Sequence, residues 1–358
     1  MSKMRTALLG LGLVVEQIHL PALCAVPALQ LVAGCDSRKE RRNWAEQRGI
    51  RTTYADAAEM LEKEKPELVV IATPPDTHRD MCILALRHGA HVLCEKPFVS
   101  DFKQADEVVA AVAEANRLLV VNHEYRFLDT YLKAKQAIDR GDFGRPYLIQ
   151  AWQQMFHPPS HETNWRANLV QSTLSEFGGH ALDLFSYFFD AAPLTITANM
   201  PKVRADTEAD VLVQATLRYP AERMATLLMN RVSRAPMRYL EMRIDCEKAS
   251  LRLSFGGVAK VGAEWSGEAG RPVFRASMVK GGEARVERGG RSTILAYDRQ
   301  EARPMATARL VGEMIAAIRA GRISLASVNH ARSLAQTIYA GYESARRGET
   351  VNVASLVT

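Results

Sequence analysis

Residues that could handle protons and stabilise charge occur in two short segments of the chain. The first is Cys94-Glu95-Lys96-Pro97, which directly follows an apolar run. A lysine ammonium that faces a substrate can polarise a reacting oxygen, give it a proton or stabilise negative charge on it. A Glu-Lys pair in a turn is otherwise most simply a solvated surface feature. The place of Lys96 just after an expected strand favours the chemical role.

The second segment is Glu176-Phe-Gly-Gly-His180-Ala-Leu-Asp183, which has a helical pattern. On a regular helix Glu176, His180 and Asp183 share one face, because they are spaced i, i+4 and i+7. A carboxylate beside a histidine can fix the imidazole tautomer and raise its basicity, which suits proton transfer. The simpler alternative is an exposed helix face. Gly178 and Gly179 argue against it, because each costs roughly 1 kcal/mol relative to alanine inside a helix and is tolerable where a ligand or another backbone approaches closely.

A third motif, Gly10-Leu-Gly12-Leu-Val-Val15, lies between an apolar run and a helical pattern. Gly10 permits a tight turn, and Gly12 lets the backbone approach a pyrophosphate at the N-terminus of the following helix. Asp36 ends the next apolar run, where its carboxylate can bind the hydroxyls of an adenosine ribose. Val15 replaces the third glycine of the full fingerprint. Together these residues predict a dinucleotide site.

A parallel sheet would bring these motifs together. Over the first 121 residues, short apolar runs alternate with helical patterns, which predicts a doubly wound parallel sheet of an α/β protein. The expected strands are Thr6–Leu9, Leu31–Cys35, a weak one near Arg51–Thr53, Leu68–Ala72, His91–Cys94 and Leu118–Val121. Thr77 and Asp101 each have the pattern of a helix N-cap. Because ligands bind at the carboxyl ends of parallel strands, we expect Gly10, Asp36 and Lys96 along one edge of the sheet.

The second half of the chain follows a different pattern. Its strand candidates come in sequence without helices between them, which predicts an antiparallel or mixed sheet in an α+β domain. These candidates are Tyr147–Phe156, Leu194–Val203, Val211–Tyr219, Met224–Val232, Tyr239–Cys246 and Ser250–Phe255. Helices are expected at Thr130–Arg140, Ala306–Ala320 and Ala331–Arg346. Residues 266–304 indicate hairpins and exposed loops. We therefore expect one domain over residues 1–122 and a second over residues 123–358.

The composition is that of an ordinary globular protein. Of its 358 residues 47% are hydrophobic and 24% charged, which excludes intrinsic disorder and a coiled coil. No run approaches the roughly 18 apolar residues that a membrane span needs. The net charge is +6, but basic and acidic residues are interleaved, so we expect small anionic ligands such as nucleotides rather than nucleic acid. Five scattered cysteines without a C-x-x-C pair indicate a reducing cytoplasm, and Ala7–Val15 is interpreted as a buried strand and turn rather than a signal peptide.

Taken in order, these motifs resemble the Gfo/Idh/MocA oxidoreductases, a family named for glucose-fructose oxidoreductase, inositol dehydrogenase and a rhizopine-catabolism protein. The matching segments are Ala7-Leu-Leu-Gly10-Leu-Gly12, His19-Leu-Pro21-Ala-Leu23, Asp36, Ala72-Thr-Pro74-Pro75 with His78, Gly89-Ala-His-Val-Leu-Cys-Glu95-Lys96-Pro97, Tyr125-Arg126-Phe127 and the Glu176–Asp183 helix. The Glu-Lys-Pro block is specific in this context, and the match runs over most of the chain.

The resemblance implies a Rossmann domain followed by an α+β domain with a large open, mostly antiparallel sheet that builds homodimers or homotetramers. The last helix is expected to return toward the Rossmann domain. The cofactor-binding residues that the resemblance implies are Gly10, Gly12, Leu13, Val14, Asp36, Ser37, Arg38, Thr73, Pro74, His78, Glu95 and Lys96. The family's lysine corresponds to Lys96, its Asp-x-x-x-His pair to Glu176 and His180, and its following acid to Asp183. Glutamate at 176 departs from the usual aspartate, because it keeps the charge and lengthens the side chain.

We therefore expect an NAD(P)-dependent dehydrogenase that acts on a secondary alcohol of a sugar, cyclitol or related polyol, with NAD favoured by Asp36 and NADP as the alternative. His180 would take the hydroxyl proton, Lys96 would stabilise the alkoxide, and Glu176 would orient the pair. No metal is expected, because the nicotinamide carries the redox chemistry. The residues expected to line the substrate pocket are Lys96, Asn122, Arg126, Trp165, Arg166, His180 and Asp183. Packing explains Asn122-His123 and Trp165-Arg166 about as well.

Two alternatives remain open from the sequence. One is a glycosidase or lyase in which the cofactor is reduced and reoxidised within a single catalytic cycle. The other is a non-catalytic nucleotide sensor, against which the intact Lys96 and His180 argue. Neither a membrane nor nucleic acid is expected as a partner.

Overall fold

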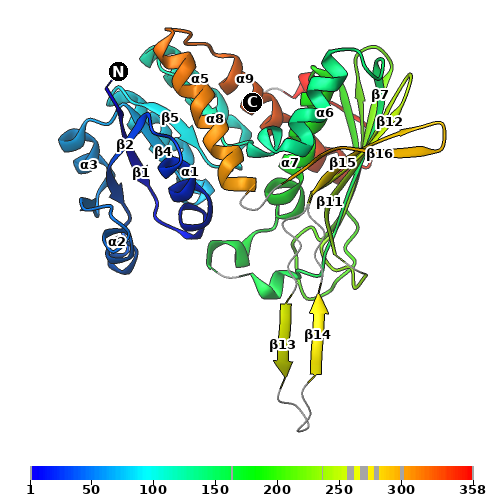
Figure 1. The fold of residues 1–358 in the computed structure, drawn as a ribbon, viewed down its shortest axis with the longest axis horizontal. Coiled ribbons are helices and arrows are strands. Elements are labelled where there is room, and N and C mark those ends of the chain that lie inside the picture. The colour runs from blue at the N-terminus through cyan, green and yellow to red at the C-terminus, as the bar shows by residue number, and fades with distance from the viewer. Residues whose placement is uncertain are drawn as a thin grey trace.

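The computed structural model describes residues 2–162, 164–235, 237–255, 262–266, 273–277, 282–298 and 302–356. The chain forms two main sheets with helices between and around them (Figure 1). A short hairpin of β13 (Gly262–Ser266) and β14 (Val273–Ser277) extends away from the larger sheet.

The N-terminal sheet is parallel, with the strand order β3-β2-β1-β4-β5-β6, as the alternation of strands and helices predicts. Its strands are β1 Met4–Leu9, β2 Leu29–Cys35, β3 Thr53–Tyr54, β4 Leu68–Ile71, β5 His91–Cys94 and β6 Leu119–Val121. Its helical segments are η1 Val15–His19, α1 Leu20–Cys24, α2 Lys39–Glu46, α3 Ala57–Glu64, η2 Pro75–Thr77, α4 His78–Arg87 and α5 Phe102–Ala115. β2 begins at Leu29 rather than Leu31, because its first residues alternate between buried and exposed and so lack a continuous apolar run.

The two expected helix caps have different outcomes. Asp101 caps α5 as predicted, because its carboxylate accepts a hydrogen bond from the backbone N–H of Lys103 at 3.0 Å. The prediction for Thr77 was wrong: its hydroxyl donates to the carbonyl oxygen of Pro74 at 2.7 Å and makes no hydrogen bond to the start of α4. The reason is that the short η2 turn leads directly into α4, so that Thr77 lies inside a helical turn.

The second sheet has nine strands in the order β16-β15-β12-β11-β7-β10-β9-β8-β17. Its strands are β7 Pro146–Gln154, β8 Thr195–Asn199, β9 Leu212–Tyr219, β10 Arg223–Asn230, β11 Arg238–Cys246, β12 Ser250–Phe255, β15 Glu283–Arg288, β16 Arg291–Tyr297 and β17 Val351–Asn352. Among the described strands, β7 and β10 pair in parallel and the other pairs are antiparallel, which confirms a mixed, mostly antiparallel sheet. β8 is shorter than expected and ends at Asn199, just before Pro201, which cannot donate to a strand ladder.

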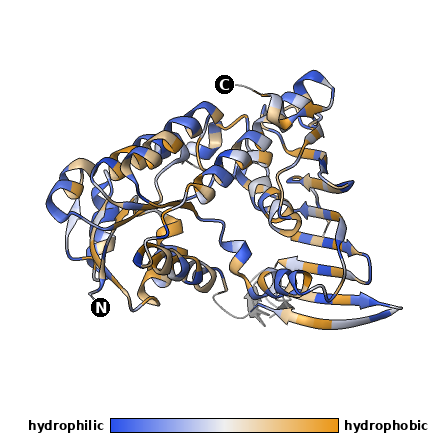
Figure 2. Ribbon diagram, turned by 90° about the horizontal axis from the view of Figure 1, so that it is seen from above, coloured by the Kyte–Doolittle hydropathy of each residue, from blue (hydrophilic) through white to orange (hydrophobic). Residues whose placement is uncertain are grey.

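One face of this sheet is covered by helices and the other is open. Hydrophilic and hydrophobic residues alternate along its strands (Figure 2), so successive side chains point to opposite faces. The helical segments of this half are η3 Glu124–Phe127, α6 Asp129–Asp139, η4 Pro159–His161, η5 Asn164–Asn168, η6 Thr173–Gly178, α7 Gly179–Phe189, α8 Ala302–Arg319, α9 Ala326–Arg347 and η8 Val353–Ser355. α6 and α7 pack on the covered face.

The helices α8 and α9 begin earlier than the sequence predicts and lie between the two sheets (Figure 1). α8 includes Pro304 in its first turn, where a missing backbone N–H costs little. α9 places Val328 and Ala331 in the core of the N-terminal sheet. Further along α9, the Ser344 hydroxyl accepts a hydrogen bond from the Ala198 N–H of β8 at 2.9 Å, so this helix contacts both sheets. None of the helices in the described ranges is both long and apolar enough to cross a membrane.

Candidate active site

The turn after β1 leaves an open backbone surface. Gly10 has φ +84°, and a Cβ on it would lie 2.5 Å from the carbonyl oxygen of Ala72, so no larger residue fits. A Cβ on Gly12 would meet no heavy atom within 4 Å. The next side chain, Leu13, is 64% exposed. No neighbouring protein group requires a glycine at position 12, and the leucine beside it is exposed. Both features fit a turn whose backbone is covered by a bound dinucleotide.

Asp36 lies at the end of β2 and joins this turn. Its carboxylate accepts hydrogen bonds from the backbone N–H groups of Leu11 and Arg38, both at 3.0 Å. Burial by itself raises the pKa of Asp36, but the hydrogen bonds from the Arg38 side chain and from these two N–H groups lower it below its usual value. The ionised carboxylate thus lies beside the turn after β1, and its expected contact with ribose hydroxyls stays a prediction. Ser37 and Arg38 are exposed beside it.

His78 connects the loop after β4 with the loop after β5. His78 is buried, and its ring nitrogens lie 2.8 Å from the Pro97 carbonyl oxygen and 2.9 Å from the Thr73 carbonyl oxygen. His78, which the sequence predicts to bind the cofactor, thus bridges the two loops that carry Thr73, Pro74 and Lys96. Its buried position corresponds to a supporting role rather than to an exposed contact.

Glu95 and Asn122, which the sequence predicts to contact ligands, are also buried. Glu95 is buried, with one carboxylate oxygen 2.7 Å from His19 Nε2 and 2.7 Å from Asn122 Nδ2, which donates to it. The other oxygen accepts the backbone N–H of Lys96 at 3.1 Å. Burial alone would raise the pKa of Glu95, but the hydrogen bond and charge of His19, with Asn122 and Lys96, lower it. Asn122 has no exposed surface in this structure, and its expected place in the substrate pocket stays a prediction.

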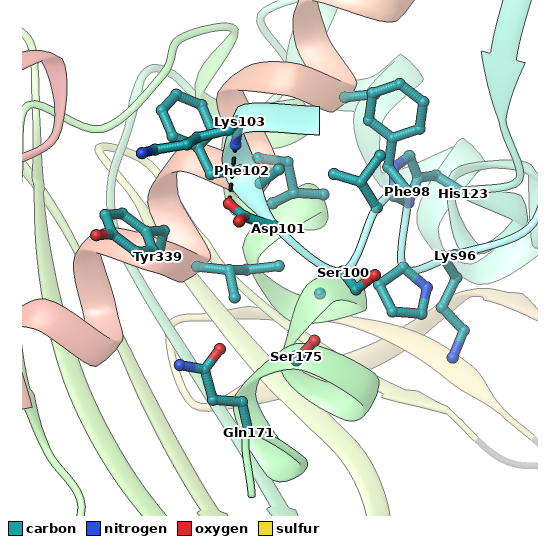
Figure 3. A pocket seen from close by; sticks show the side chains of 17 residues that line it. Lys96, Phe98, Ser100, Asp101, Phe102, Lys103, His123, Gln171, Ser175 and Tyr339 are labelled. Atoms are coloured by element: carbon teal, nitrogen blue, oxygen red, sulfur yellow. Dashed lines mark hydrogen bonds between the residues drawn. The ribbon is translucent and has the colours of Figure 1, made fainter. Parts of the chain in front are cut away.

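Lys96 extends from the end of β5 to the second half of the chain. Its Nζ donates a hydrogen bond to the backbone carbonyl oxygen of Glu176 at 3.0 Å, so it contacts η6 through the main chain. Lys96 also lines a cavity of about 450 Å³ between the loop after β5, η6 and α9. Figure 3 shows Lys96 and His123 at one end of this cavity and Phe102 and Tyr339 at the other.

The expected regular helix over Glu176–Asp183 is interrupted, and this moves Glu176. Residues Thr173–Gly178 form a π-helix, and α7 begins only at Gly179. A π-turn changes the angle between successive side chains, so i, i+4 spacing no longer fixes one face. The Glu176 carboxylate instead pairs with Arg166 Nε at 3.2 Å. Arg166 in turn lies over the Trp165 ring, 4.2 Å from its centroid.

The two glycines at this junction have different surroundings. A Cβ on Gly178 would lie 2.9 Å from a Leu174 side-chain carbon and 3.2 Å from the Met229 sulfur, so a larger residue there would displace these side chains. A Cβ on Gly179 would meet only Ile338, at 3.9 Å. Gly179 lines the same cavity as Lys96, so it keeps that space open.

His180 is buried with its imidazole flat against Tyr125. The two ring centroids are 3.8 Å apart with an interplanar angle of 2°, and Tyr125 also stacks with Phe255 at 4.5 Å. Burial, then the positive charges of Lys96 and Arg303, hold the pKa of His180 well below its usual value, with Asp183 opposing them. The imidazole is therefore neutral near pH 7 and can accept a proton.

Asp183 belongs to a buried ionic cluster rather than to an open pocket wall. Arg126 donates to its two carboxylate oxygens at 2.7 and 2.5 Å. His330 from α9 lies 2.7 Å from the same carboxylate. Burial alone would raise the pKa of Asp183, but Arg126, His123 and His330 hold it well below its usual value. The expected substrate contacts Arg126 and Asp183 thus neutralise one another.

Several contacts of the site could not be predicted from the sequence. His330 lies far along the chain from Asp183, and a single histidine on a helix is not distinctive. Tyr125 and Arg303 act on His180 through stacking and charge that depend on the tertiary fold. His19 stood inside a segment that resembles the family, but its contact with Glu95 was not foreseen.

Two family models match the chain. One, described as "Oxidoreductase family, NAD-binding Rossmann fold", matches residues 4–123, and the other, described as "GFO/IDH/MocA C-terminal domain", matches residues 131–252. An oxidoreductase from Agrobacterium radiobacter, solved in complex with NAD+, L-tartaric acid and magnesium, superposes with a TM-score of 0.81 at 19% identity. That superposition covers 99% of this chain and 100% of the other, and it establishes a shared fold.

Characterised relatives match over shorter stretches. D-glucoside 3-dehydrogenase of Escherichia coli (strain K12) is 32% identical over 152 residues, which is 42% of this chain and 43% of that protein. Myo-inositol 2-dehydrogenase of Thermotoga maritima is 26% identical over 204 residues, which is 57% of this chain and 58% of that protein. The chain thus spans about half the length of these curated relatives. With an NAD-binding Rossmann domain followed by the characteristic C-terminal domain, the chain belongs to the Gfo/Idh/MocA family of oxidoreductases.

Proposed function

We propose that the protein is an NAD(P)-dependent dehydrogenase that oxidises a secondary alcohol of a sugar, cyclitol or related polyol, with NAD as the preferred cofactor. The observation that carries this proposal is the approach of Lys96 to η6 and α7, the segment that holds the neutral His180. A fixed ammonium and a buried proton acceptor are the two groups that alcohol oxidation requires of a protein.

The cofactor would lie over the open turn at Gly12, with its adenosine ribose at Asp36. When bound, it supplies the acceptor for the hydride that leaves the carbinol carbon. Lys96 stabilises the negative charge that develops on the substrate oxygen, an effect worth about 3–4 kcal/mol for one fixed donor in a dry site. His180 accepts the hydroxyl proton at a ring nitrogen, and its stack on Tyr125 holds the ring plane.

Glu176 has a different role from the one that the sequence suggests. Because its carboxylate pairs with Arg166, we infer that it fixes the Trp165-Arg166 segment against the helix. Trp165 and Arg166 then form a wall of the substrate pocket, with an indole face for sugar C–H groups and a guanidinium for hydroxyls. The names of the two relatives above, a glucoside dehydrogenase and an inositol dehydrogenase, support a polyol substrate.

A panel of sugars, glycosides and inositols tests this function. Each compound is incubated with NAD, and both the absorbance of NADH and the mass of the organic product are followed. The proposal expects one NADH for each ketone formed with at least one member of the panel. A product that appears without net NADH would instead support an internal redox cycle, and NAD binding with no product would support a sensor.

A further inference from the structure

Arg231 is a fully buried arginine that directly follows β10. It is 0% exposed. Its backbone N–H donates to the Val211 carbonyl oxygen at 2.9 Å, and its own carbonyl oxygen accepts the His157 N–H at 2.7 Å. These two bonds extend the pairing of β10 with its neighbours β9 and β7. The main chain at Arg231 therefore has a fixed position at the edge of the larger sheet.

The Arg231 guanidinium contacts two segments that are distant from it along the chain. One amino group donates to the Ser172 hydroxyl oxygen at 2.7 Å, and the other donates to the Glu162 carboxylate. The guanidinium also lies over the Phe177 ring, 4.6 Å from its centroid. Ser172 precedes η6 and Phe177 belongs to it, whereas Glu162 lies between η4 and η5. One side chain thus joins the π-helix to the η4–η5 segment.

The ion pair of Arg231 with Glu162 is desolvated. The Arg231 side chain is 1% exposed and that of Glu162 8%. Charges buried this deeply are tolerated when they are paired and hydrogen-bonded, and removal of one partner is costly. His157, with a 40% exposed side chain, lies 3.1 Å from the same Glu162 oxygen. Without Arg231, Glu162 would keep this outer partner, so we expect it to move toward solvent and take the η4–η5 segment with it.

A second ion pair holds the same segment at η5. Arg166 pairs with Glu176 of η6 at 3.2 Å and lies over the Trp165 ring. The Arg166 side chain is 43% exposed, so solvent screens this pair and it costs less to break than a buried one. The position of the η4–η5 segment therefore depends mainly on the buried pair.

We propose that Arg231 is a positioning residue of the reaction, which fixes the Trp165-Arg166 wall of the substrate pocket against η6. It does so by holding Glu162 of the η4–η5 segment beside Ser172. The proposal rests on the dehydrogenase function and on the pocket wall proposed above. Arg231 acts through this wall and needs no contact with substrate or cofactor, so it should affect substrate binding more than the chemical step.

Steady-state kinetics of Arg231→Met test this role. Methionine removes the charge and both hydrogen bonds but keeps an unbranched side chain over Phe177. With the best substrate from the panel, KM should rise about tenfold or more and kcat should change less than about threefold, because wall contacts are made equally in the ground and transition states. NAD affinity should not change. Arg140→Met, which removes an exposed arginine paired with Asp142, is the matched control and should behave as wild type. A fall in kcat at unchanged KM would overturn the role.

Glu162→Gln tests the same role with a smaller change, including the case in which Arg231→Met does not fold. It keeps the shape of the side chain and removes its charge, so KM should rise in the same direction by about threefold or more. The double variant should have the KM of Arg231→Met alone, because the two residues act as a unit. Multiplication of the two single effects would contradict this coupling.

Fluorescence of Trp165 follows the wall without any need for turnover. The chain used keeps only Trp165 of its four tryptophans, with phenylalanine at the other positions. Acrylamide quenching of its emission should increase about twofold or more in Arg231→Met, and less in Glu162→Gln, because the unpaired charge releases the segment from η6. Arg140→Met should show the quenching of its parent.

The two readouts separate this proposal from the function on which it rests. Unchanged quenching in both Arg231→Met and Glu162→Gln would overturn the positioning role of Arg231. A wild type that forms no NADH with any substrate would instead overturn the proposed function, and the effect on KM with it. The quenching would then still decide whether Arg231 holds the wall.

Discussion

At the scale of single residues, the candidate site holds Glu95 and Asp183 ionised and His180 neutral. Burial disfavours charge on all of them, but Glu95 has His19 and Lys96 beside it, and Asp183 has Arg126. His180 has mainly positive neighbours, so burial and charge act in the same direction on its pKa. The site therefore has two ionised carboxylates beside cationic side chains, and an uncharged proton acceptor at neutral pH.

Cofactor preference belongs to this scale. Asp36→Ala should weaken NAD binding by about tenfold or more, because a charged hydrogen-bond acceptor for the ribose is lost. The same change should reduce the difference in affinity between NAD and NADP. A negative charge no longer repels the 2′-phosphate, and Arg38 remains nearby. Calorimetric titration of both cofactors measures this, with Glu40→Ala, an exposed residue in the first turn of α2, as the control. A clear preference of the wild type for NADP would reverse the assignment.

Single residues were predictable where a motif fixed both their type and their place in the chain. Lys96 and Asp36 follow strands, so the sheet determines where they lie. The exposure of Glu95 and Asn122 was not predictable, because it depends on His19 approaching from another element. The partner of Glu176 was missed because Arg166 lies in a segment without a regular pattern.

At the scale of elements, η6 and α7 are anchored by one half-buried carboxylate. Asp210 accepts hydrogen bonds from the backbone N–H groups of Ser172, Thr173 and Leu174 at 2.5, 2.9 and 2.9 Å. It also accepts one from the Tyr342 hydroxyl of α9 at 3.1 Å. These contacts fix the start of the segment that carries Glu176 and His180.

Removal of this anchor should therefore affect both stability and turnover. Asp210→Ala should lower the free energy of unfolding by about 2–4 kcal/mol, because it removes a helix cap and leaves buried N–H groups unpaired. Turnover should fall as well, since His180 loses its position. Denaturant unfolding and steady-state rates measure the two effects. Asp206→Ala, which removes an exposed partner of Arg204, is the control and should change neither. An unchanged unfolding midpoint in Asp210→Ala would contradict this role.

The elements themselves were largely predictable, and the π-helix was not. Hydrophobic periodicity located the helix around His180, because its apolar face must pack against the larger sheet. It could not show the extra residue per turn at Thr173–Gly178, which depends on contacts of Leu174 and Gly178 with other elements. This is the physical reason why the expected Glu176–His180 face is absent.

At the scale of the whole molecule, the open face of the nine-stranded sheet carries an apolar stripe. Leu148 and Trp152 of β7 lie directly opposite Met224 and Leu228 of β10. Met224 is 41% and Leu228 39% exposed. An exposed apolar sheet face of this kind is commonly buried by a second copy of the chain. We therefore propose a homodimer, or a tetramer built from such dimers.

Light scattering at micromolar concentration tests the assembly. Leu228→Lys should shift the protein toward the monomer, because it places a charge in the centre of the apolar stripe. Met305→Lys changes a comparably exposed residue on α8, away from this sheet face, and should leave the assembly intact. A wild-type protein that is monomeric under these conditions would contradict the proposal.

The central claim is that Lys96 stabilises the substrate oxygen while His180 accepts its proton. The most direct test is kcat/KM against pH for the wild type, Lys96→Met and His180→Asn. Because a protonated His180 cannot accept a proton, the wild-type rate should fall on the acid side, with an apparent pKa below the ordinary histidine value of about 6.5. His180→Asn should lose this acid limb along with most of its activity.

Lys96→Met should lower kcat/KM by about 10²–10³ on the plateau above the acid limb, with little change in NAD affinity. Its remaining acid limb should move upward, because the positive neighbour that lowers the pKa of His180 is gone. Lys103→Met, which removes an exposed lysine from the same cavity, should behave as wild type. Full activity of both Lys96→Met and His180→Asn, with the wild-type pH profile, would contradict the account.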